Sequence, residues 1–268
     1  MPRLAALETL RRVDRGALAR DVLDAVLRRR GLEPRDRHLA HELVQGTLRH
    51  QETLDHLLAA HVRKPLARAH AVDRAGLRLG AYQIVFLDRV PDRAAVHATV
   101  EAVKRSGRER AAGFVNAVLR ALAGTVDGEA AAAPGDAPRR AVPRGDGTWT
   151  RFTTDVLPDP AVDRAAWLAA AYSHPQSLVE RFAAQHGDEA ALRILEAGIC
   201  RPALALRPAP GREGDLRAAL ADAGHEVDTE GGCLLLRGSG SPADLPGFAD
   251  GWFRVQDPTA ADVVPLLE

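Results

Sequence analysis

The candidate nucleophiles of this 268-residue chain are its two cysteines, Cys200 and Cys233. A cysteine attacks as the thiolate, which at neutral pH requires a neighbouring base or a positive environment. Cys200 stands beside Arg201 near the end of a predicted helix, whereas Cys233 opens an apolar run. Because free cysteines are usually small core residues, we expect neither to be catalytic. Without a C-x-x-C pair they also exclude a disulfide framework and a cysteine-rich zinc site.

His38 and His41 lie three residues apart, next to Glu42, and are the nearest approach to a metal-binding pair. The metalloprotease helix instead places its histidines four residues apart with a glutamate between them. No third ligand is evident in the sequence, so we expect surface or capping histidines and no metal site.

The segment from Gly238 to Ala243 spells G-x-G-x-x-A, a pattern that binds phosphate when a helix begins at its third small residue. Pro246 and Gly247 interrupt any such helix, so we expect a flexible turn. Motifs for nucleotide hydrolysis, α/β-hydrolase chemistry and zinc deamination are missing from the sequence.

The charge is unevenly distributed, although Lys+Arg and Asp+Glu are equal at 36 each. Residues 1–125 carry 23 basic and 14 acidic residues, and the remainder carries 13 basic and 22 acidic residues. A basic half favours a polyanionic partner, because each neutralised phosphate releases counterions. Solvated helix faces explain such an excess equally well.

The composition is that of a globular protein, with 46% hydrophobic and 27% charged residues. A length of 268 residues predicts two compact units. No run approaches 18 uncharged apolar residues, and charges stand where a signal peptide would be apolar. We therefore expect a cytoplasmic protein that does not bind membranes.

These features must be positioned by a mainly α fold. Apolar residues at helical spacing predict six or seven helices in residues 1–125, an all-helical bundle. Residues 126–158 are rich in Gly, Pro and Ala and predict a flexible linker. Residues 159–250 mix helical and alternating patterns, which predicts a small α+β domain. A last strand is expected within 251–257.

Four stretches of residues 1–123 resemble the NusB family of RNA-binding helical domains: GALARDVLDAVLRR, RDRHLAHELVQGTLRH, LRLGAYQIVFLDRVPDRAAVHATVEAVKR and FVNAVLRAL. The last two carry the most telling residues, namely Tyr82, Val96, Glu101, Ala102, Lys104, Phe114, Val115, Asn116, Leu119 and Arg120. The resemblance implies a NusB-like bundle. Such domains occur alone, as antitermination factors, and also in front of a methyltransferase.

Three segments of the second half stand out: YSHPQSLVERFAAQHGDEAA, R-P-x-L-x-L-R at 201–207 and PGFADGWFRVQDPTAADVVPLL. They resemble the connecting and RNA-binding region of the RsmB (Sun/Fmu) type of ribosomal RNA cytosine-C5 methyltransferase. In that family the G-x-x-x-x-Q-D segment, here 251–257, leads into a Rossmann-like domain that binds S-adenosylmethionine. We expect residues 251–268 to begin a truncated methyltransferase domain, so that the Rossmann-like domain, the methyl-donor site and the catalytic cysteines are absent from this chain. The chain itself is then expected to bind no cofactor, and whether it is an enzyme stays open.

The resemblance implies small-subunit ribosomal RNA as the partner, with ribosomal or antitermination proteins as further candidates. The expected phosphate contacts are Arg3, Arg11, Arg12, Arg15, Arg28, Arg29, Arg30, Arg201 and Arg207. Gln256 and Asp257 are expected to act as scaffold. Two alternatives remain open: a NusB-like antitermination or ribosome-assembly factor without catalysis, and a helical protein–protein adaptor that binds no nucleic acid.

Overall fold

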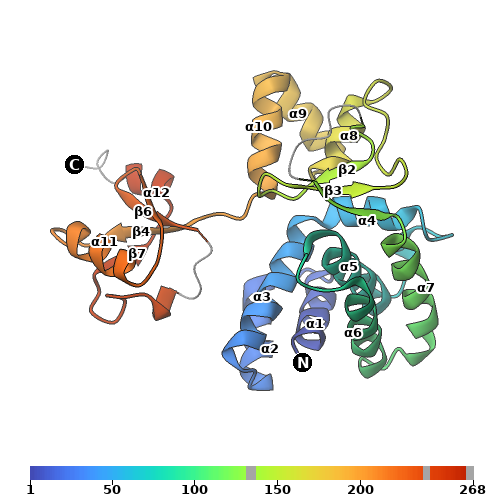
Figure 1. Ribbon diagram of the computed structural model, residues 1–268, viewed down its shortest axis with the longest axis horizontal. Helices are drawn as coiled ribbons and strands as arrows, with labels where there is room; N and C mark the ends of the chain where they lie inside the picture. The colour runs from blue at the N-terminus through green and yellow to red at the C-terminus, as the bar shows by residue number, and fades with distance from the viewer. Residues whose placement is uncertain (131–136, 238–241, 264–268) are drawn as a thin grey trace. The chain divides into compact units, whose positions relative to one another are not determined.

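The computed structural model describes residues 1–130, 137–237 and 242–263, and the chain divides into two units, residues 1–200 and 201–268 (Figure 1). The first part of unit 1 is a helical bundle, as the sequence predicts. Its helices are α1 (Pro2–Val13), α2 (Ala19–Arg30), α3 (Pro34–Arg49), α4 (Gln51–Ala59), α5 (Ala71–Phe86), α6 (Asp92–Arg105) and α7 (Ala112–Ala123), with 3-10 turns η1 (Leu66–Arg68) and η2 (Glu109–Ala111).

Helix α5 is the centre of the bundle, because it is buried along nearly its whole length and contacts α1, α3, α4, α6 and α7. Close packing requires glycine where α3 meets it: a Cβ at Gly46 would lie 2.0 Å from Cζ of Tyr82. His50, which is 3% exposed, stacks on Phe86 with ring centroids 4.0 Å apart. The aromatic stack thus fills the space between α3, α4 and α5.

A three-stranded antiparallel sheet follows the bundle, in place of the expected flexible linker. It consists of β1 (Val126–Ala130), β2 (Ala141–Pro143) and β3 (Trp149–Phe152), in the order β1-β3-β2. Thr150 donates a 2.6 Å hydrogen bond to the carbonyl of Val85, and Arg144 donates to Asp88 at 2.5 and 2.7 Å. The strands are three to five residues long, too short for a clear alternating pattern in a Gly- and Pro-rich segment.

Three more helices complete unit 1, so the boundary between compact units lies after residue 200 and not at the expected 158/159. They are α8 (Arg164–Ala171), α9 (Gln176–His186) and α10 (Asp188–Ile199). The physical reason lies at the start of α4, where the hydroxyl oxygen of Ser173 accepts hydrogen bonds from the backbone N–H of Glu52 at 3.1 Å and Thr53 at 3.4 Å. Thr53 in turn donates to the carbonyl of Ala170 at 2.7 Å. A cap supplied from 120 residues away joins the later helices to the bundle.

Unit 2 is a small α+β fold with a four-stranded antiparallel sheet in the order β5-β6-β4-β7. Its elements are β4 (Leu204–Pro208), α11 (Glu213–Asp222), β5 (Val227–Glu230), β6 (Cys233–Leu236), η3 (Pro242–Asp244), β7 (Phe253–Val255) and α12 (Pro258–Asp262). Leucines 206, 216, 220, 234 and 236 and Phe253 form one buried cluster with Leu245. The predicted strand and helix pattern from residue 203 to 257 is confirmed.

Residues 253–255 belong to this sheet, because they form β7, which pairs with β4. The structure therefore places them within unit 2, and the expected start of another domain at residue 251 is wrong. Asp257 accepts from the backbone N–H of Thr259 at 2.9 Å and caps α12. The G-x-G-x-x-A pattern falls largely on 238–241, and the end of the expected domain on 264–268, both outside the described residues.

The cap from Ser173 can be tested by two substitutions. Ser173→Ala removes the acceptor of both N–H groups and is expected to lower the free energy of unfolding by about 1 kcal/mol. Ser173→Gly removes the same hydroxyl but relieves a φ of 58° at a non-glycine residue, so its loss should be smaller. Urea unfolding of both variants measures the difference, and a Ser173→Ala variant as stable as the wild type would show that the hydroxyl does not cap α4.

The buried His50 predicts a pH dependence. Burial, with smaller contributions from Arg49 and Arg144, lowers the pKa of His50 to about 3. The unfolded state then binds the extra proton, so stability is complete above pH 6.5 and declines as the pH falls. Between pH 6.5 and 5 the wild type should lose about 1.5 kcal/mol more than His50→Phe, which keeps a stacked ring without a titrating nitrogen. Equal losses in the two proteins would contradict this assignment.

Candidate nucleic-acid interface

Several of the arginines expected to contact RNA are held by other residues of the bundle. Arg3 donates from Nε to Oε1 of the buried Gln83 at 2.6 Å, and burial lowers the pKa of Arg3. Arg29 and Arg30 both bind Glu8, at 2.5 and 2.9 Å. Burial disfavours the ionised form of Glu8, but these hydrogen bonds outweigh it and lower the pKa of Glu8. These three guanidinium groups therefore already have hydrogen-bonding partners within the bundle, which leaves them less available to a phosphate.

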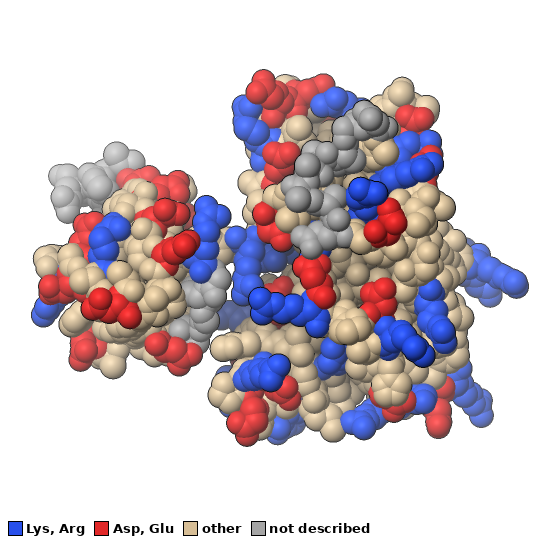
Figure 2. All heavy atoms as spheres, viewed as in Figure 1, with Lys and Arg blue, Asp and Glu red and all other residues tan. Residues whose placement is uncertain are grey.

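The remaining arginines of this set differ in exposure. Arg12, Arg15 and Arg28 are exposed and Arg11 is partly buried, with no ion pair to any residue that the structure describes. In unit 2, Arg201 is exposed and Arg207 is partly buried. The nine arginines thus differ in exposure and in pairing, and Figure 2 shows basic and acidic side chains intermixed over the visible face of unit 1.

A further basic segment lies between α4 and α5. We call residues 61–69 the basic loop. Its cations, Arg63, Lys64 and Arg68, are exposed and form no ion pair within the described residues. Three cations among six consecutive residues around Pro65 were the sequence signal for this feature. The loop follows α4 at the right-hand edge of unit 1 in Figure 1.

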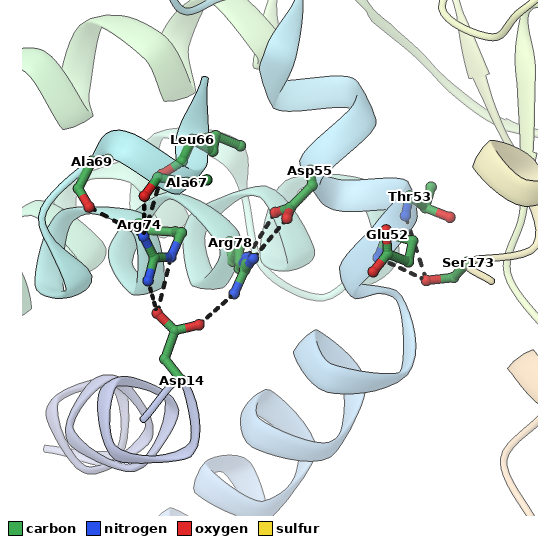
Figure 3. Close-up of polar contacts among 10 residues, drawn as sticks. All are labelled: Asp14, Glu52, Thr53, Asp55, Leu66, Ala67, Ala69, Arg74, Arg78 and Ser173. Atoms are coloured by element: carbon green, nitrogen blue, oxygen red, sulfur yellow. Dashed lines mark hydrogen bonds and ion pairs between the residues drawn. The ribbon is translucent and has the colours of Figure 1, made fainter. Parts of the chain in front are cut away.

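Arg74 of α5 holds the basic loop in place (Figure 3). Its Nη1 donates to the carbonyls of Leu66, Ala67 and Ala69, at 3.4, 3.2 and 3.1 Å. Its Nε donates to Asp14 at 2.9 Å, so the same guanidinium ties the loop to the end of α1. A planar guanidinium with five donors can satisfy carbonyls and a carboxylate at once.

Arg78, one turn later on α5, completes this ion-pair network. It donates to Asp14 at 3.0 Å and to both carboxylate oxygens of Asp55, on α4, at 2.7 and 2.6 Å. Burial disfavours the charged guanidinium, but the hydrogen bonds and charges of Asp55 and Asp14 prevail and raise the pKa of Arg78. The network therefore fixes α1, α4, α5 and the basic loop relative to one another.

A cavity of about 470 Å³ opens between the basic loop and α7. It is lined by residues 61–66, Arg68, Ala69, Asp73, Phe114, Ala117 and Val118. Phe114 is 44% exposed, whereas the other large apolar residues of α7 are buried in the bundle. The acid in the wall, Asp73, is paired with Arg108 at 2.6 Å, so the cations of the loop are left without a carboxylate.

An apolar floor with an exposed aromatic ring and a cationic rim suits an unstacked base and its phosphates. Bases stack on aromatic side chains, and neighbouring lysines and arginines neutralise the backbone. The volume lies within the usual range of about 300–1,000 Å³ for ligand cavities. The arrangement can therefore bind a single-stranded nucleic acid.

The thiols and histidines lie apart from this cavity. Cys233 is fully buried, and burial raises the pKa of its thiol. Cys200 is exposed, and its thiol donates to the carbonyl of Glu196 at 3.2 Å. Among the described residues no group of three or more His, Cys, Asp or Glu side chains is arranged to hold a metal ion. The pKa of His41 is lowered, mainly by burial.

Comparison with known proteins bears on the bundle directly, because residues 1–124 match the NusB family. Residues 1–124 form a NusB-family domain. Over 79 residues the chain is 42% identical to the transcription antitermination protein NusB of Bacillus velezensis, covering 29% of this chain and 61% of that protein. The predicted NusB-like bundle is thereby confirmed, and the basic loop and Phe114 are parts of this NusB-family domain.

The chain as a whole is similar to longer proteins. It is 32% identical over 270 residues to the probable ribosomal RNA small subunit methyltransferase B of Bacillus subtilis, covering 98% of this chain and 54% of that protein. It thus spans about half the length of this relative. The crystal structure of PH0851 shares the fold, with a TM-score of 0.62 at 15% identity, over 96% of this chain and 53% of that one.

No helix in the described residues is long and apolar enough to cross a membrane.

The role of Arg74 predicts a local effect that a general loss of stability would not produce. Arg74→Met removes the donors to three carbonyls and one partner of Asp14, and should lower the free energy of unfolding by about 2–3 kcal/mol. Hydrogen exchange should accelerate most in residues 61–70. As a control, Arg151→Met breaks the exposed pair with Asp127 and should cost at most about 1 kcal/mol. Unchanged exchange in the basic loop would contradict the role of Arg74.

Proposed function

We propose that this chain binds ribosomal RNA as the RNA-handling part of a small-subunit ribosomal RNA cytosine-C5 methyltransferase. The observation that carries the proposal is the cavity of the NusB-family domain, where the unpaired cations of the basic loop face the exposed Phe114. The similarity to a ribosomal RNA methyltransferase along nearly the whole chain supports the choice of RNA. Such a role belongs in the cytoplasm.

Methyl transfer is proposed to depend on residues other than the two thiols of this chain. Attack on C6 of cytosine requires an accessible thiolate, and the buried Cys233 has a raised pKa. Cys200 is exposed, but its thiol contacts a backbone carbonyl and no base. S-adenosylmethionine remains the donor that the resemblance implies, and we propose that the described residues contribute RNA binding and not the donor site.

The alternative is an antitermination or ribosome-assembly factor without catalysis. It is favoured by the similarity to an antitermination protein, which covers part of the NusB-family domain. The two differ in the RNA that is preferred. Tighter binding to transcripts outside the mature small-subunit RNA, or to a ribosomal protein, would favour this alternative.

RNA binding is tested by fluorescence anisotropy with labelled single-stranded fragments of small-subunit ribosomal RNA over a salt series. The triple variant Arg63→Gln, Lys64→Gln, Arg68→Gln should bind roughly 10- to 100-fold more weakly at low salt, because each lost phosphate contact removes counterion release. The slope of log affinity against log salt should become shallower by about 2 units. Phe114→Ala should weaken binding by roughly fivefold or more, through loss of base stacking.

Matched controls separate position from net charge. The triple variant Arg151→Gln, Arg164→Gln, Arg193→Gln removes the same charge from exposed arginines of unit 1 that already have acidic partners. Leu18→Ala removes an apolar side chain that is 73% exposed elsewhere in the bundle. Both controls should bind as the wild type does. Wild-type affinity that is weak and independent of salt would reject RNA binding and favour a protein–protein adaptor.

A further inference from the structure

Two arginines oppose each other directly across the sheet of unit 2. Arg207 of β4 and Arg254 of β7 are partners in the antiparallel register. Directly opposed residues place their side chains on the same face, with Cβ atoms roughly 4.5–5.5 Å apart, and like charges at such positions destabilise a sheet. The two arginines therefore repel each other, and the backbone pairing of β4 with β7 does not require a charged side chain at either position.

Neither guanidinium is neutralised within the described residues. Arg207 donates from Nη1 to the uncharged Oε1 of Gln256 at 3.2 Å. Arg254 is exposed and forms no hydrogen bond or ion pair through its side chain in that part of the chain. Asp257, which follows Gln256, uses a carboxylate oxygen to cap α12. Among the described residues, the pair thus has no carboxylate within ion-pair distance, although Asp257 and Asp262 act on the same thiol, Cys233, as Arg207 does.

The other arginines of this unit show that acids are available. Residues 201–268 contain six arginines and eleven acidic residues. Arg212 pairs with Asp215 at 2.9 Å, and Arg237 lies 3.8 Å from Asp228. Arg217 likewise lies 3.9 Å from Glu213. In an acidic unit, two adjacent arginines without a carboxylate point to an anion that comes from outside the chain.

The face that carries the pair is not the face that packs on α11. Side chains alternate along a strand, and Leu206 of β4 and Phe253 of β7 belong to the buried cluster with Leu216 of α11. Arg207 and Arg254, each adjacent to one of these residues, therefore project from the opposite face. The same face also carries Ala205 and Cys233, which pack against Ala261 of α12. Arg207 is partly buried and Arg254 is exposed, so an anionic chain would reach the pair from the side of Arg254.

We infer that Arg207 and Arg254 together hold one backbone phosphate of RNA across strands β4 and β7. The inference rests on the proposed function and adds a second point of contact, in unit 2. A phosphate between the two guanidinium groups would accept hydrogen bonds from both and replace their repulsion with two attractive charge-assisted contacts. Because the contact is to the backbone, it positions the RNA without reading its sequence.

The test compares Arg207→Gln, Arg254→Gln and the double variant with Arg237→Gln in the full chain, by anisotropy with the same ribosomal RNA fragments. Each single variant should bind roughly three- to tenfold more weakly at low salt, and the double variant should reduce the salt slope by about 1 unit, the value for one phosphate. Arg237→Gln removes the same charge from a residue near Asp228 and should change affinity less than about twofold.

Thermal unfolding without RNA provides a second readout. Because substitution relieves like-charge repulsion, Arg254→Gln should unfold at the same temperature as the wild type or a higher one, while binding RNA more weakly. A lower unfolding temperature would overturn the inference, since the pair would then serve the fold.

The outcomes distinguish this inference from the proposed function. If the wild type binds RNA and the Arg207 and Arg254 variants behave as Arg237→Gln does, the phosphate contact is wrong and the proposed function stands. If the wild type does not bind ribosomal RNA, both are wrong.

Discussion

The contact on which the NusB-family domain depends most is the ion-pair network of Asp14, Arg74, Arg78 and Asp55 (Figure 3). Its four side chains are largely withdrawn from water, with exposures between 11% and 29%. Taking charges out of water is costly, and the cost is recovered only when each charge is well paired. Here Asp14 pairs with two guanidinium groups, those of Arg74 and Arg78. Removing any one of these side chains leaves a partly buried charge without its full set of partners.

The network also determines which cations are available for binding. Arg74 binds three carbonyls of the basic loop, of which that of Leu66 also accepts the backbone N–H of Ala69 in the turn η1. The guanidinium and this turn together fix the loop, while Arg63 and Lys64 are exposed. A preorganised cationic rim loses less conformational entropy when a ligand binds than mobile side chains would. The structural arginines of α5 thus support the exposed cations of the loop.

Much of the fold was predictable, because helix formation follows local periodicity. Seven helices of the bundle and the strand pattern of unit 2 follow from the spacing of apolar residues. The sheet after residue 125 and the packing of α8 to α10 could not be obtained this way. They depend on contacts between distant residues, such as the cap that Ser173 provides to Glu52 and Thr53, which no local pattern encodes.

The candidate site was less predictable than the fold for the same reason. A sequence shows that Arg3, Arg29 and Arg30 are basic, but only tertiary structure shows that Gln83 and Glu8 engage them. Conversely, the sequence Lys64-Pro65 predicts only the end of a helix. The structure shows that Lys64 lines the same cavity as Phe114, which lies fifty residues later in the chain.

Net charge is therefore a poor guide to where a polyanion binds this protein. Unit 2 is acidic overall, yet none of its described acids forms an ion pair with Arg207 or Arg254. The bundle is basic overall, yet several of its cations are neutralised internally. A phosphate is attracted most strongly by a cation that has no acidic partner within the fold. Two opposite charges in an ion pair largely cancel, and salt screens what remains of their field beyond a Debye length of about 10 Å. The surplus of unpaired cations at particular sites, and not the balance of the chain, sets the electrostatic contribution to binding.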